Sequence, residues 1–320
     1  MAVRVMRGRR PGSYRRTMIE IENLSKRYGD KLAVDGLSFT VEPGVVTGFL
    51  GPNGAGKSTT MRMIAGLDRP SGGSVRVNGV DYRSSRAPMA ELGILLEARA
   101  THTGRSARNH LAALAQTSGI GRRRVDEVID QVGLGAVAGK RAGGFSLGMG
   151  QRLGIASALL GRPRTVVLDE PVNGLDPDGV RWIRTLLRDL AHQGHTVFVS
   201  SHLMSEMAQT ATRLVVVGRG RLIADCTVEQ FLARTTTTSV AVRTPDPARL
   251  RVLLGPDVSI SSTDRQLLHI TGRTAEEIGT IAWQARLPIF ELSTVQPSLE
   301  EAFMQATSDS VEYSTAGVRR

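Results

Sequence analysis

Four short apolar stretches, rich in β-branched residues, recur along the first two thirds of the chain. They cover residues 45–51, 165–171, 195–202 and 213–218. Runs of this length and composition are typical of strands that are buried on both faces of a parallel sheet. The first stretch leads into residues 59–66, which have the pattern of a helix start. The hydrophobic pattern therefore predicts an α/β core built on a parallel sheet.

A different periodicity fills the interval between the first two of these strands. Residues 109–119 and 123–134 place apolar side chains three and four positions apart. This spacing predicts two amphipathic helices, joined by a link that is bounded by glycine. We expect a packed helical subdomain over about residues 98–160. Its outer surface could also receive a segment of a partner, for which Arg105 and Arg108 are exposed candidates.

The composition changes after about Phe231, where the polar run ARTTTTSV reads as a link into a second unit. Beyond it, strand-like and helical patterns alternate in the order β-α-β-β-α-β, and a final helix follows. This order predicts a small ferredoxin-like α+β domain over residues 235–310, with a role in packing or dimer support. Its segments are residues 238–244, 247–255, 258–262, 266–272, 274–285, 289–296 and 297–307.

Composition agrees with one large and one small globular domain. The chain has 320 residues, of which 41% are hydrophobic and 22% are charged. No apolar run approaches the roughly 18 residues that a membrane-spanning helix needs. The only cysteine, Cys226, cannot form an internal disulfide. With no signal peptide pattern at the start of the sequence, these features predict a cytoplasmic protein.

The net charge of +11 invites a search for a nucleic-acid surface, but much of it lies in one place. Residues 1–17 contain six arginines and no acidic residue. This stretch has no helical or strand periodicity, so we expect a disordered basic tail there and a second disordered tail over residues 311–320. The charge alone therefore does not predict a nucleic-acid partner.

A glycine-rich loop directly after the first strand carries the strongest chemical signal. Glycines allow the tight turns that point successive N–H groups inward, toward a phosphate. The phosphate would sit on the N-terminus of the following helix, with Lys57 reaching the terminal phosphates and the Ser58 hydroxyl placed to ligate Mg²⁺. The loop comprises Gly51, Pro52, Asn53, Gly54, Ala55, Gly56, Lys57, Ser58 and Thr59.

Two further strands end in residues suited to phosphate chemistry. Asp169 and Glu170 follow the second apolar stretch, and His202 follows the third. The carboxyl ends of parallel strands meet at one edge of a sheet, so Asp169 can enter the Mg²⁺ shell while Glu170 orients or deprotonates the attacking water. The sequence therefore predicts a nucleotide triphosphatase whose catalytic residues are Glu170 and His202.

In this combination and order, the motifs resemble those of the ATP-binding subunit of an ABC transporter. The resemblance runs from Met18 to about Phe231, and it implies an ATP-binding domain over residues 18–234. The expected fold is a P-loop NTPase of the ABC ATPase type, with a parallel-sheet core, an antiparallel β subdomain and a helical subdomain. The cofactors that it implies are ATP and Mg²⁺.

Five residues match further positions of this family. Tyr28 resembles the aromatic residue that stacks on adenine. FSLGMGQR resembles the family signature, with Ser146 and Gly148 on its serine and glycine, although Leu147 and Met149 replace a glycine and a glutamine. Asp176, in NGLDP, resembles the aspartate that bridges two subunits, and His202 matches the family's switch histidine.

One position departs from the family. Where a glutamine usually contacts Mg²⁺ and water and faces the membrane partner, this chain has LGILLEARA, which places Glu97 there. A carboxylate can ligate Mg²⁺ but adds negative charge beside the phosphates. We predict that Glu97 is the counterpart of this glutamine and a third metal ligand beside Ser58 and Asp169. The reason is that a subgroup resembling drug-resistance and self-immunity exporters carries an acid there, in a similar ILLE context.

The resemblance implies a function in export. Two copies would bind head to tail, hydrolyse ATP and drive a separate transmembrane permease at the cytoplasmic face of the membrane, with no nucleic acid involved. Two alternatives stay open from the sequence. One is the ATPase of an importer, and the other is a soluble ABC ATPase that acts on nucleic acid or the ribosome. The transported cargo is not encoded in these motifs.

Overall fold

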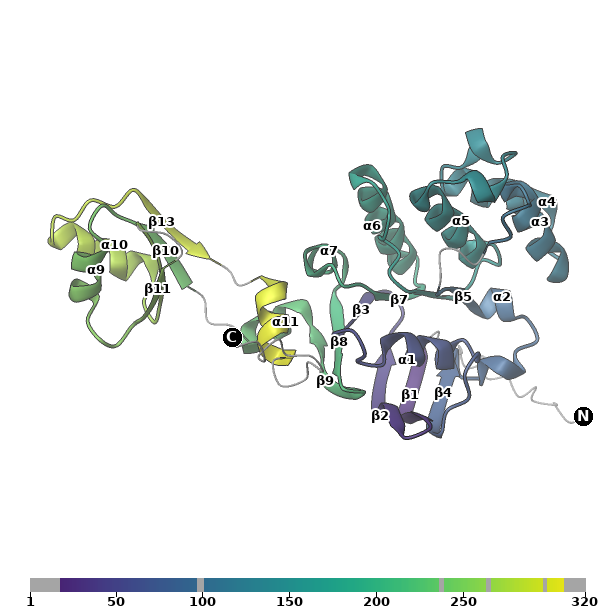
Figure 1. Cartoon of the computed structure of the whole chain (residues 1–320), viewed down its shortest axis with the longest axis horizontal. Helices are drawn as coiled ribbons and strands as arrows, with labels where there is room; N and C mark the ends of the chain where they lie inside the picture. The colour runs from purple at the N-terminus through teal and green to yellow at the C-terminus, as the bar shows by residue number, and fades with distance from the viewer. Residues whose placement is uncertain (1–17, 97–100, 236–238, 263–265, 296–297, 308–320) are drawn as a thin grey trace, which may run out of the picture. The chain divides into compact units, whose positions relative to one another are not determined.

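The computed structural model describes residues 18–96, 101–235, 239–262, 266–295 and 298–307 (Figure 1). Both predicted tails, residues 1–17 and 311–320, lie outside the described residues. Contacts divide the chain into two compact units. The first comprises the described residues up to His202 together with Thr210–Asp225. The second comprises Leu203–Gln209 and the described residues from Cys226 onward.

The core of the first unit is a sheet of six strands in the order β5-β6-β7-β3-β8-β9. The pairs that join β5 through β8 in this order are all parallel, which confirms the predicted parallel sheet. Strands β3, β6 and β7 are buried along their whole length, as their apolar composition requires. The bounds are β3 Val46–Leu50, β5 Leu92–Leu95, β6 Thr165–Leu168, β7 Thr196–Ser200, β8 Arg213–Gly218 and β9 Arg221–Thr227.

A second, antiparallel sheet of the first unit has the order β2-β1-β4, with bounds β1 Ile19–Tyr28, β2 Lys31–Val41 and β4 Gly72–Val77. Helix α1 (Lys57–Ile64) contributes to the core shared by both sheets. Phe39, Phe49 and Phe198 form a cluster in this core, with ring centroids 4.9 to 5.9 Å apart. This shared core fixes the start of α1 relative to the ends of the parallel strands.

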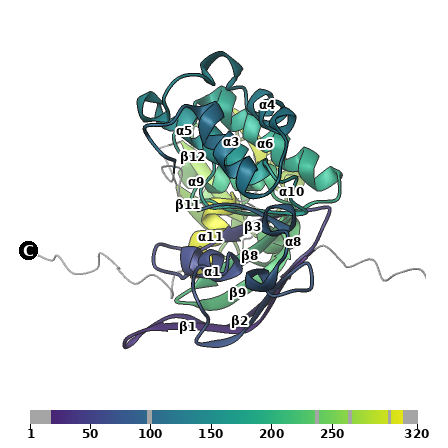
Figure 2. The same cartoon turned by 90° about the vertical axis from the view of Figure 1, so that its right-hand side faces the viewer.

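The predicted helical subdomain consists of α3 (Ala107–Thr117), α4 (Arg122–Gln131) and α5 (Leu147–Leu159) (Figure 2). Arg124 joins two of these helices, because its guanidinium donates to the Leu159 and Leu160 carbonyls at the end of α5, at 2.6 and 3.1 Å. The short helix α2 (Pro88–Glu91) precedes β5, and α6 (Pro177–His192) follows β6.

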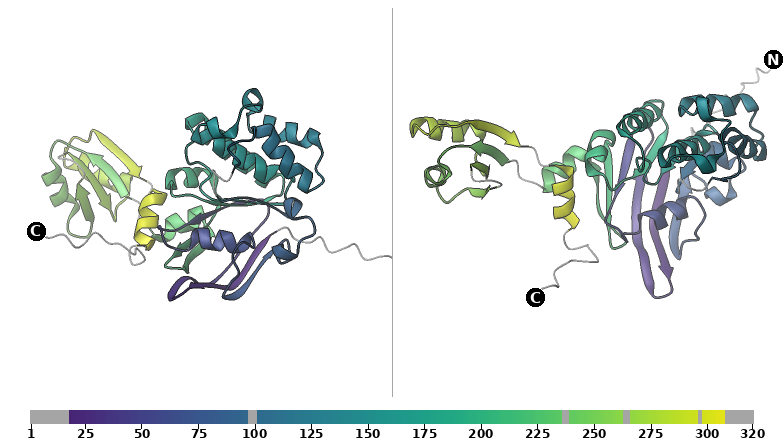
Figure 3. Two further views of the ribbon diagram at one scale, coloured as in Figure 1. Left: turned by 45° about the vertical axis from the view of Figure 1, so that its right-hand side comes forward. Right: turned by 45° about the horizontal axis from the view of Figure 1, so that its top comes forward.

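The second unit has the predicted order of strands and helices (Figure 3). Its four strands pair antiparallel in the order β11-β12-β10-β13, and α9 and α10 share a core with the sheet. This is the topology of the ferredoxin-like fold. The bounds are β10 Ser239–Arg243, α9 Pro247–Leu254, β11 Ser259–Ser262, β12 Leu267–Thr271, α10 Ala275–Gln284 and β13 Glu291–Val295.

Three further helices group with the second unit. They are α7 (Met204–Thr210), α8 (Val228–Thr235) and α11 (Leu299–Thr307), and α11 packs against α8. The resemblance predicts a first domain that extends to residue 234, whereas the contacts divide the chain after Asp225. The domain bounds from sequence stay a prediction. Of the helices in the described ranges, none combines the length and the apolar character needed to cross a membrane.

Candidate functional site

The glycine-rich loop lies between the end of β3 and the start of α1, as predicted. Gly54 and Gly56 have φ of 82° and 95°, in the left-handed region that favours glycine. A Cβ atom on Gly56 would lie 2.5 Å from the Ala33 carbonyl oxygen, and one on Gly51 would lie 2.5 Å from the Val217 carbonyl oxygen. The close approach of another backbone segment therefore requires glycine at positions 51 and 56. At position 56 the left-handed backbone conformation favours glycine as well.

The start of α1 is suited to an anion. Gly56 is its N-cap and has no side chain with which to cap the helix. The first N–H groups of a helix have no partner within the helix, and the helix dipole places partial positive charge there. No acidic residue lies in this first turn. Of the remaining residues of the motif, Pro52, Asn53 and Ala55 lie in the loop and Thr59 lies on the first turn of α1.

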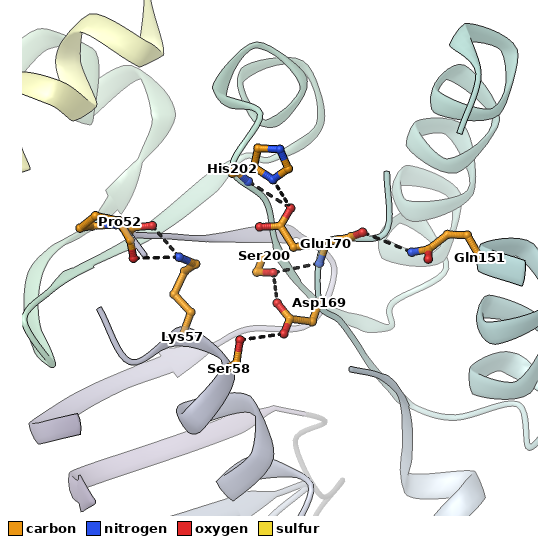
Figure 4. A network of polar contacts seen from close by, with 9 residues as sticks. Pro52, Lys57, Ser58, Gln151, Asp169, Glu170, Ser200 and His202 are labelled. Carbon is orange, nitrogen blue, oxygen red and sulfur yellow. Dashed lines mark hydrogen bonds and ion pairs between the residues drawn. The ribbon is translucent and has the colours of Figure 1, made fainter. Parts of the chain in front are cut away.

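The Lys57 side chain turns back over the loop (Figure 4). Its Nζ donates to the carbonyl oxygens of Gly51, at 2.5 Å, and Pro52, at 3.1 Å. Burial lowers the pKa of Lys57, and the nearby charges of Glu170 and Asp169 act in the opposite direction. The ammonium group is thus held in a partly buried position, with neutral acceptors and two acids close by.

Asp169 follows β6 directly, and both of its carboxylate oxygens accept hydrogen bonds (Figure 4). Ser58 Oγ, at the start of α1, donates to Asp169 Oδ2 at 3.0 Å. Ser200 Oγ, at the end of β7, donates to Asp169 Oδ1. The ends of two strands and the start of one helix thus meet at this carboxylate, as predicted for Ser58 and Asp169.

Glu170 is held at its backbone and at its side chain. Its N–H donates to Ser200 Oγ at 3.0 Å, and its φ of 51° is unusual for a residue with a side chain. Glu170 Oε2 lies 2.7 Å from His202 Nδ1 and accepts from the His202 backbone N–H at 3.2 Å. Glu170 and His202 thus lie together at the ends of β6 and β7, and the catalytic roles assigned to them from sequence stay predictions.

The signature segment begins α5. Ser146 is the N-cap, and its Oγ accepts from the Met149 N–H at 3.3 Å. A Cβ atom on Gly148 would lie 2.8 Å from the Gly174 carbonyl oxygen, so glycine permits α5 to approach the loop that follows Glu170. Ser146 is exposed, and its hydroxyl hydrogen is not needed for the cap.

Asp176 and Tyr28 both have local partners. Asp176 caps α6, because its Oδ1 accepts from the Gly179 N–H at 2.8 Å. The Tyr28 hydroxyl donates to Asp68 Oδ2 at 2.7 Å, and Lys26 Nζ lies 4.9 Å from the centre of the Tyr28 ring. Tyr28 is 47% exposed. Burial and then the hydrogen bond to Asp68 raise the pKa of Tyr28.

Glu97 lies outside the described residues, so its predicted place in the metal shell is untested. The strand before it is described: β5 pairs with β6 so that Leu95 lies beside Leu168, and the Asp169 N–H donates to the Leu95 carbonyl at 2.7 Å. Of the two arginines expected to meet a partner, Arg108 forms an ion pair with Asp126 within the chain, and both arginines are exposed.

Sequence reasoning missed Ser200 and placed Gln151 only at the end of the signature segment, without its contact to Glu170. Ser200 bridges Asp169 and Glu170, and Gln151, on α5, donates from Nε2 to the Glu170 carbonyl at 3.2 Å. A small polar residue at the end of a buried strand was the available signal for Ser200. For Gln151 the available signal was a polar side chain on the otherwise apolar face of a helix.

Two separate parts of the chain match known families. Residues 34–173 match the family described as ABC transporter. Residues 238–300 match a family described only as a domain of unknown function, DUF8746.

Several curated proteins are similar over most of the chain. An uncharacterized ABC transporter ATP-binding protein of Bacillus subtilis, YhcH, is 34% identical over 301 residues, covering 93% of this chain and 98% of its own length. The daunorubicin resistance ATP-binding protein DrrA3 of Streptomyces coeruleorubidus is 33% identical, covering 92% and 96%. The bacitracin transport ATP-binding protein BcrA of Bacillus licheniformis is 38% identical, covering 68% and 72%.

Solved structures agree in fold. An ATP-binding subunit of an ABC transporter superposes with a TM-score of 0.63 at 25% identity, covering 68% of this chain and 93% of that one. A bacterial ABC transporter cassette in a dimeric structure superposes with a TM-score of 0.61 at 23% identity, covering 66% and 98%. The second likeness concerns the fold alone.

Proposed function

The chain belongs to the ABC transporter family of ATP-binding proteins, which are ATPases, and from that premise we propose that it powers export of an antibiotic or another hydrophobic cargo. The observation that carries this proposal is the meeting of Lys57, Ser58, Asp169, Glu170 and His202 at the ends of β3, β6 and β7. Relatives named for bacitracin transport and daunorubicin resistance support the direction of transport.

ATP would place its phosphates on the N-terminus of α1. The N–H groups of the loop donate to phosphate oxygens there, and Lys57 exchanges the carbonyls of Gly51 and Pro52 for the terminal phosphates. Because burial lowers the Lys57 pKa, the arrival of negative phosphate charge would stabilise its protonated form. Tyr28, beside the loop, is our candidate for stacking on adenine, and Lys26 already lies over its ring.

The residues at the start of α1 and the end of β6 fit a magnesium ion that is shared with the phosphates. Ser58 Oγ and Asp169 Oδ2 lie 3.0 Å apart, and hydroxyl and carboxylate oxygens are ligands that Mg²⁺ prefers. When bound, Mg²⁺ would neutralise charge that develops on the phosphate oxygens. We propose Ser58 and Asp169 as its protein ligands, with Glu97 as a third.

Glu170 is placed to accept a proton from water. His202 donates to Oε2 through its backbone N–H, and its ring lies against the same oxygen, which leaves Oε1 to receive the water proton. The water oxygen then bonds to the γ-phosphorus, and the bond from that phosphorus to the bridging oxygen breaks. ADP leaves with the bond electrons, and the proton passes from Glu170 to the solvent or to phosphate.

A second copy of the chain would complete each site. In a head-to-tail pair, Ser146 and Gly148 of one copy would face the γ-phosphate held by the other, with the free hydroxyl hydrogen of Ser146 as donor. Asp176 would bridge the two copies near the start of α6. The change between the ATP-bound pair and the hydrolysed pair would be transmitted to a separate membrane permease, which places this chain at the membrane surface.

Export can be tested in inverted membrane vesicles that contain the chain together with a permease that copurifies with it from membranes. We expect ATP-dependent uptake of labelled bacitracin or daunorubicin with the unaltered chain, and none with Glu170→Gln. Glu276→Gln changes an exposed acid on α10 and is the matched control, with uptake as in the unaltered chain. Equal uptake with Glu170→Gln would contradict the proposal, as would cargo movement that does not depend on ATP.

A further inference from the structure

Gln151 connects the signature helix to the backbone of Glu170. It lies on the second turn of α5 and is 2% exposed, and its Nε2 donates to the Glu170 carbonyl oxygen at 3.2 Å (Figure 4). A buried amide that reaches across from a helix to the carbonyl of a residue outside that helix restricts both partners. The contact therefore ties the position of α5 to the conformation of Glu170.

The Glu170 backbone needs such support. A non-glycine residue with φ of 51° lies in a sparsely populated region, and surrounding contacts must hold it there. Its N–H is fixed by Ser200 Oγ at 3.0 Å, and its carbonyl accepts from Gln151 and from the Asn173 N–H at 3.2 Å each. Loss of the Gln151 donor would allow the peptide plane after Glu170 to rotate, and the carboxylate would then leave its place beside His202.

The first turn of α5, directly before Gln151, carries the signature. Ser146 caps the helix, and Gly148 lies against the Gly174 carbonyl, in the loop that follows Glu170. Five residues of a helix span about 7.5 Å, so Ser146 and Gln151 lie on one short rigid segment. A displacement of the capped end is thereby passed on to the Glu170 carbonyl.

We propose that Gln151 is a positioning residue that links the two ATP sites of a dimer through one chain. This inference rests on the proposed function, in which α5 of a chain serves its partner's nucleotide while Glu170 serves its own. ATP at the partner's site orients α5 through Ser146, and Gln151 then fixes the Glu170 backbone in its left-handed conformation. Each bound nucleotide thus prepares the catalytic glutamate of the opposite site.

The test compares Gln151→Met in the whole chain with Gln116→Met. The second variant is the matched control, because it makes the same change at an exposed position of α3. Methionine fills similar volume without a donor. For Gln151→Met we expect about a tenfold lower kcat, equivalent to about 1.4 kcal/mol, with the dissociation constant for ATP changed less than about twofold, as expected when ground-state binding is kept. The Hill coefficient for ATP should fall toward 1 as the sites lose their coupling.

Mixed dimers locate the effect within one chain. The chain with an intact Glu170 is mixed with a tenfold excess of the Glu170→Gln chain and is called the minor chain. Most minor chains then pair with a Glu170→Gln chain, so the intact Glu170 of such a dimer is that of the minor chain. Gln151→Met in the minor chain should lower activity about tenfold, whereas the same change placed in the Glu170→Gln chain should leave the activity unchanged. A merely structural role would lower both or neither, and that result would overturn the inference.

The two proposals fail in different ways. Normal turnover by Glu170→Gln would remove the catalytic role on which both depend. Loss of turnover by Glu170→Gln, together with kinetics of Gln151→Met that match Gln116→Met, would overturn only the link through α5. If Gln151→Met instead lowers the thermal midpoint and ATP affinity together, its role is structural and the inference is likewise overturned.

Discussion

The two compact units differ in the polar side chains that they bring together. In the first unit, Ser58 and Asp169 are 111 residues apart in sequence and bond at 3.0 Å, and Glu170 and Ser200 are 30 apart. In the second, Thr274 and Glu277 form a capping box with bonds to residues three positions away, and Ser298 and Glu301 repeat it. Each unit also contains the other kind of contact, since Asp176 caps α6 in the first and Arg243 donates to Glu291, 48 residues away, in the second. Only in the first of these networks do a hydroxyl, two carboxylates and an imidazole meet, and we therefore place the chemistry there.

The largest expected effect concerns the loop lysine. Lys57→Ala removes the charge that reaches the phosphates, and ATP binding should weaken by about 100-fold or more, since hydrogen bonds to charged groups are strong. Titration with a fluorescent ATP analogue measures this. Hydrogen exchange in β10 and β12 should match the unaltered chain, because the change lies in the other unit. Retained ATP affinity would contradict the placement of the site.

The next effect concerns the core of the second unit. Ile270, on β12, is fully buried, and Ile270→Ala should destabilise this unit by about 2 to 5 kcal/mol, because it leaves a cavity. Hydrogen exchange in β10 and β12 should rise accordingly. ATP affinity and the turnover of the purified chain should stay within about twofold of the unaltered values. A parallel loss of turnover would show that the second unit supports the site.

A smaller effect is expected at the hydroxyl that joins the two acids. Ser200→Ala removes one bond to Asp169 and one to Glu170. We expect kcat to fall about tenfold while ATP affinity is nearly kept, because a hydrogen bond contributes about 1 kcal/mol and the acids lose their alignment. Steady-state kinetics measure this, with Ser74→Ala, at a half-buried position of the edge strand β4, as control. Unchanged kcat would show that Ser200 is not part of the catalytic network.

The smallest effect is a pH dependence in the helical subdomain. His110 on α3 is 8% exposed, and its Nδ1 has no hydrogen-bond partner among the described residues. Burial, and then the charges of Arg105 and His102, lower the pKa of His110. The folded protein thus binds a proton at His110 less readily than the unfolded chain does. The free energy of unfolding is therefore highest above pH about 6.5 and decreases as pH falls through the lowered pKa of His110.

Urea unfolding at pH 7.5 and pH 5.5 measures this dependence. His110→Met cannot titrate, so it should reduce the loss of stability between the two pH values. Gln116→Met, at an exposed position of the same helix, is the comparison variant and should leave that loss unchanged. An identical pH dependence in His110→Met and the unaltered chain would contradict the proposed role of the buried imidazole.

Much of the fold followed from local pattern. The apolar runs that become β3, β6 and β7 are continuous because both faces of these strands are buried, and such runs are visible in sequence. The antiparallel strands β1 and β2 were expected only through the family resemblance. Their pairing contains several register shifts, which blur the alternation that would mark a strand from sequence alone.

The site was predictable where a motif specifies backbone chemistry. The positions of Lys57, Ser58 and Asp169 followed from the loop and the strand end. Ser200 and Gln151 did not, because their importance depends on which strands are neighbours and on how α5 passes Glu170. The local role of Asp176 as an N-cap was also not anticipated, since the motif directed attention to a second subunit.

The most direct test of the central claim is ATP binding, turnover and mass measured together on purified Glu170→Gln. We expect ATP affinity within about twofold of the unaltered chain and turnover lower by at least about 100-fold, as for loss of a general base. Light scattering should show an ATP-dependent doubling of mass. Normal turnover in this variant, with no dimer at saturating ATP, would contradict the claim that Glu170 completes hydrolysis in a site shared by two copies.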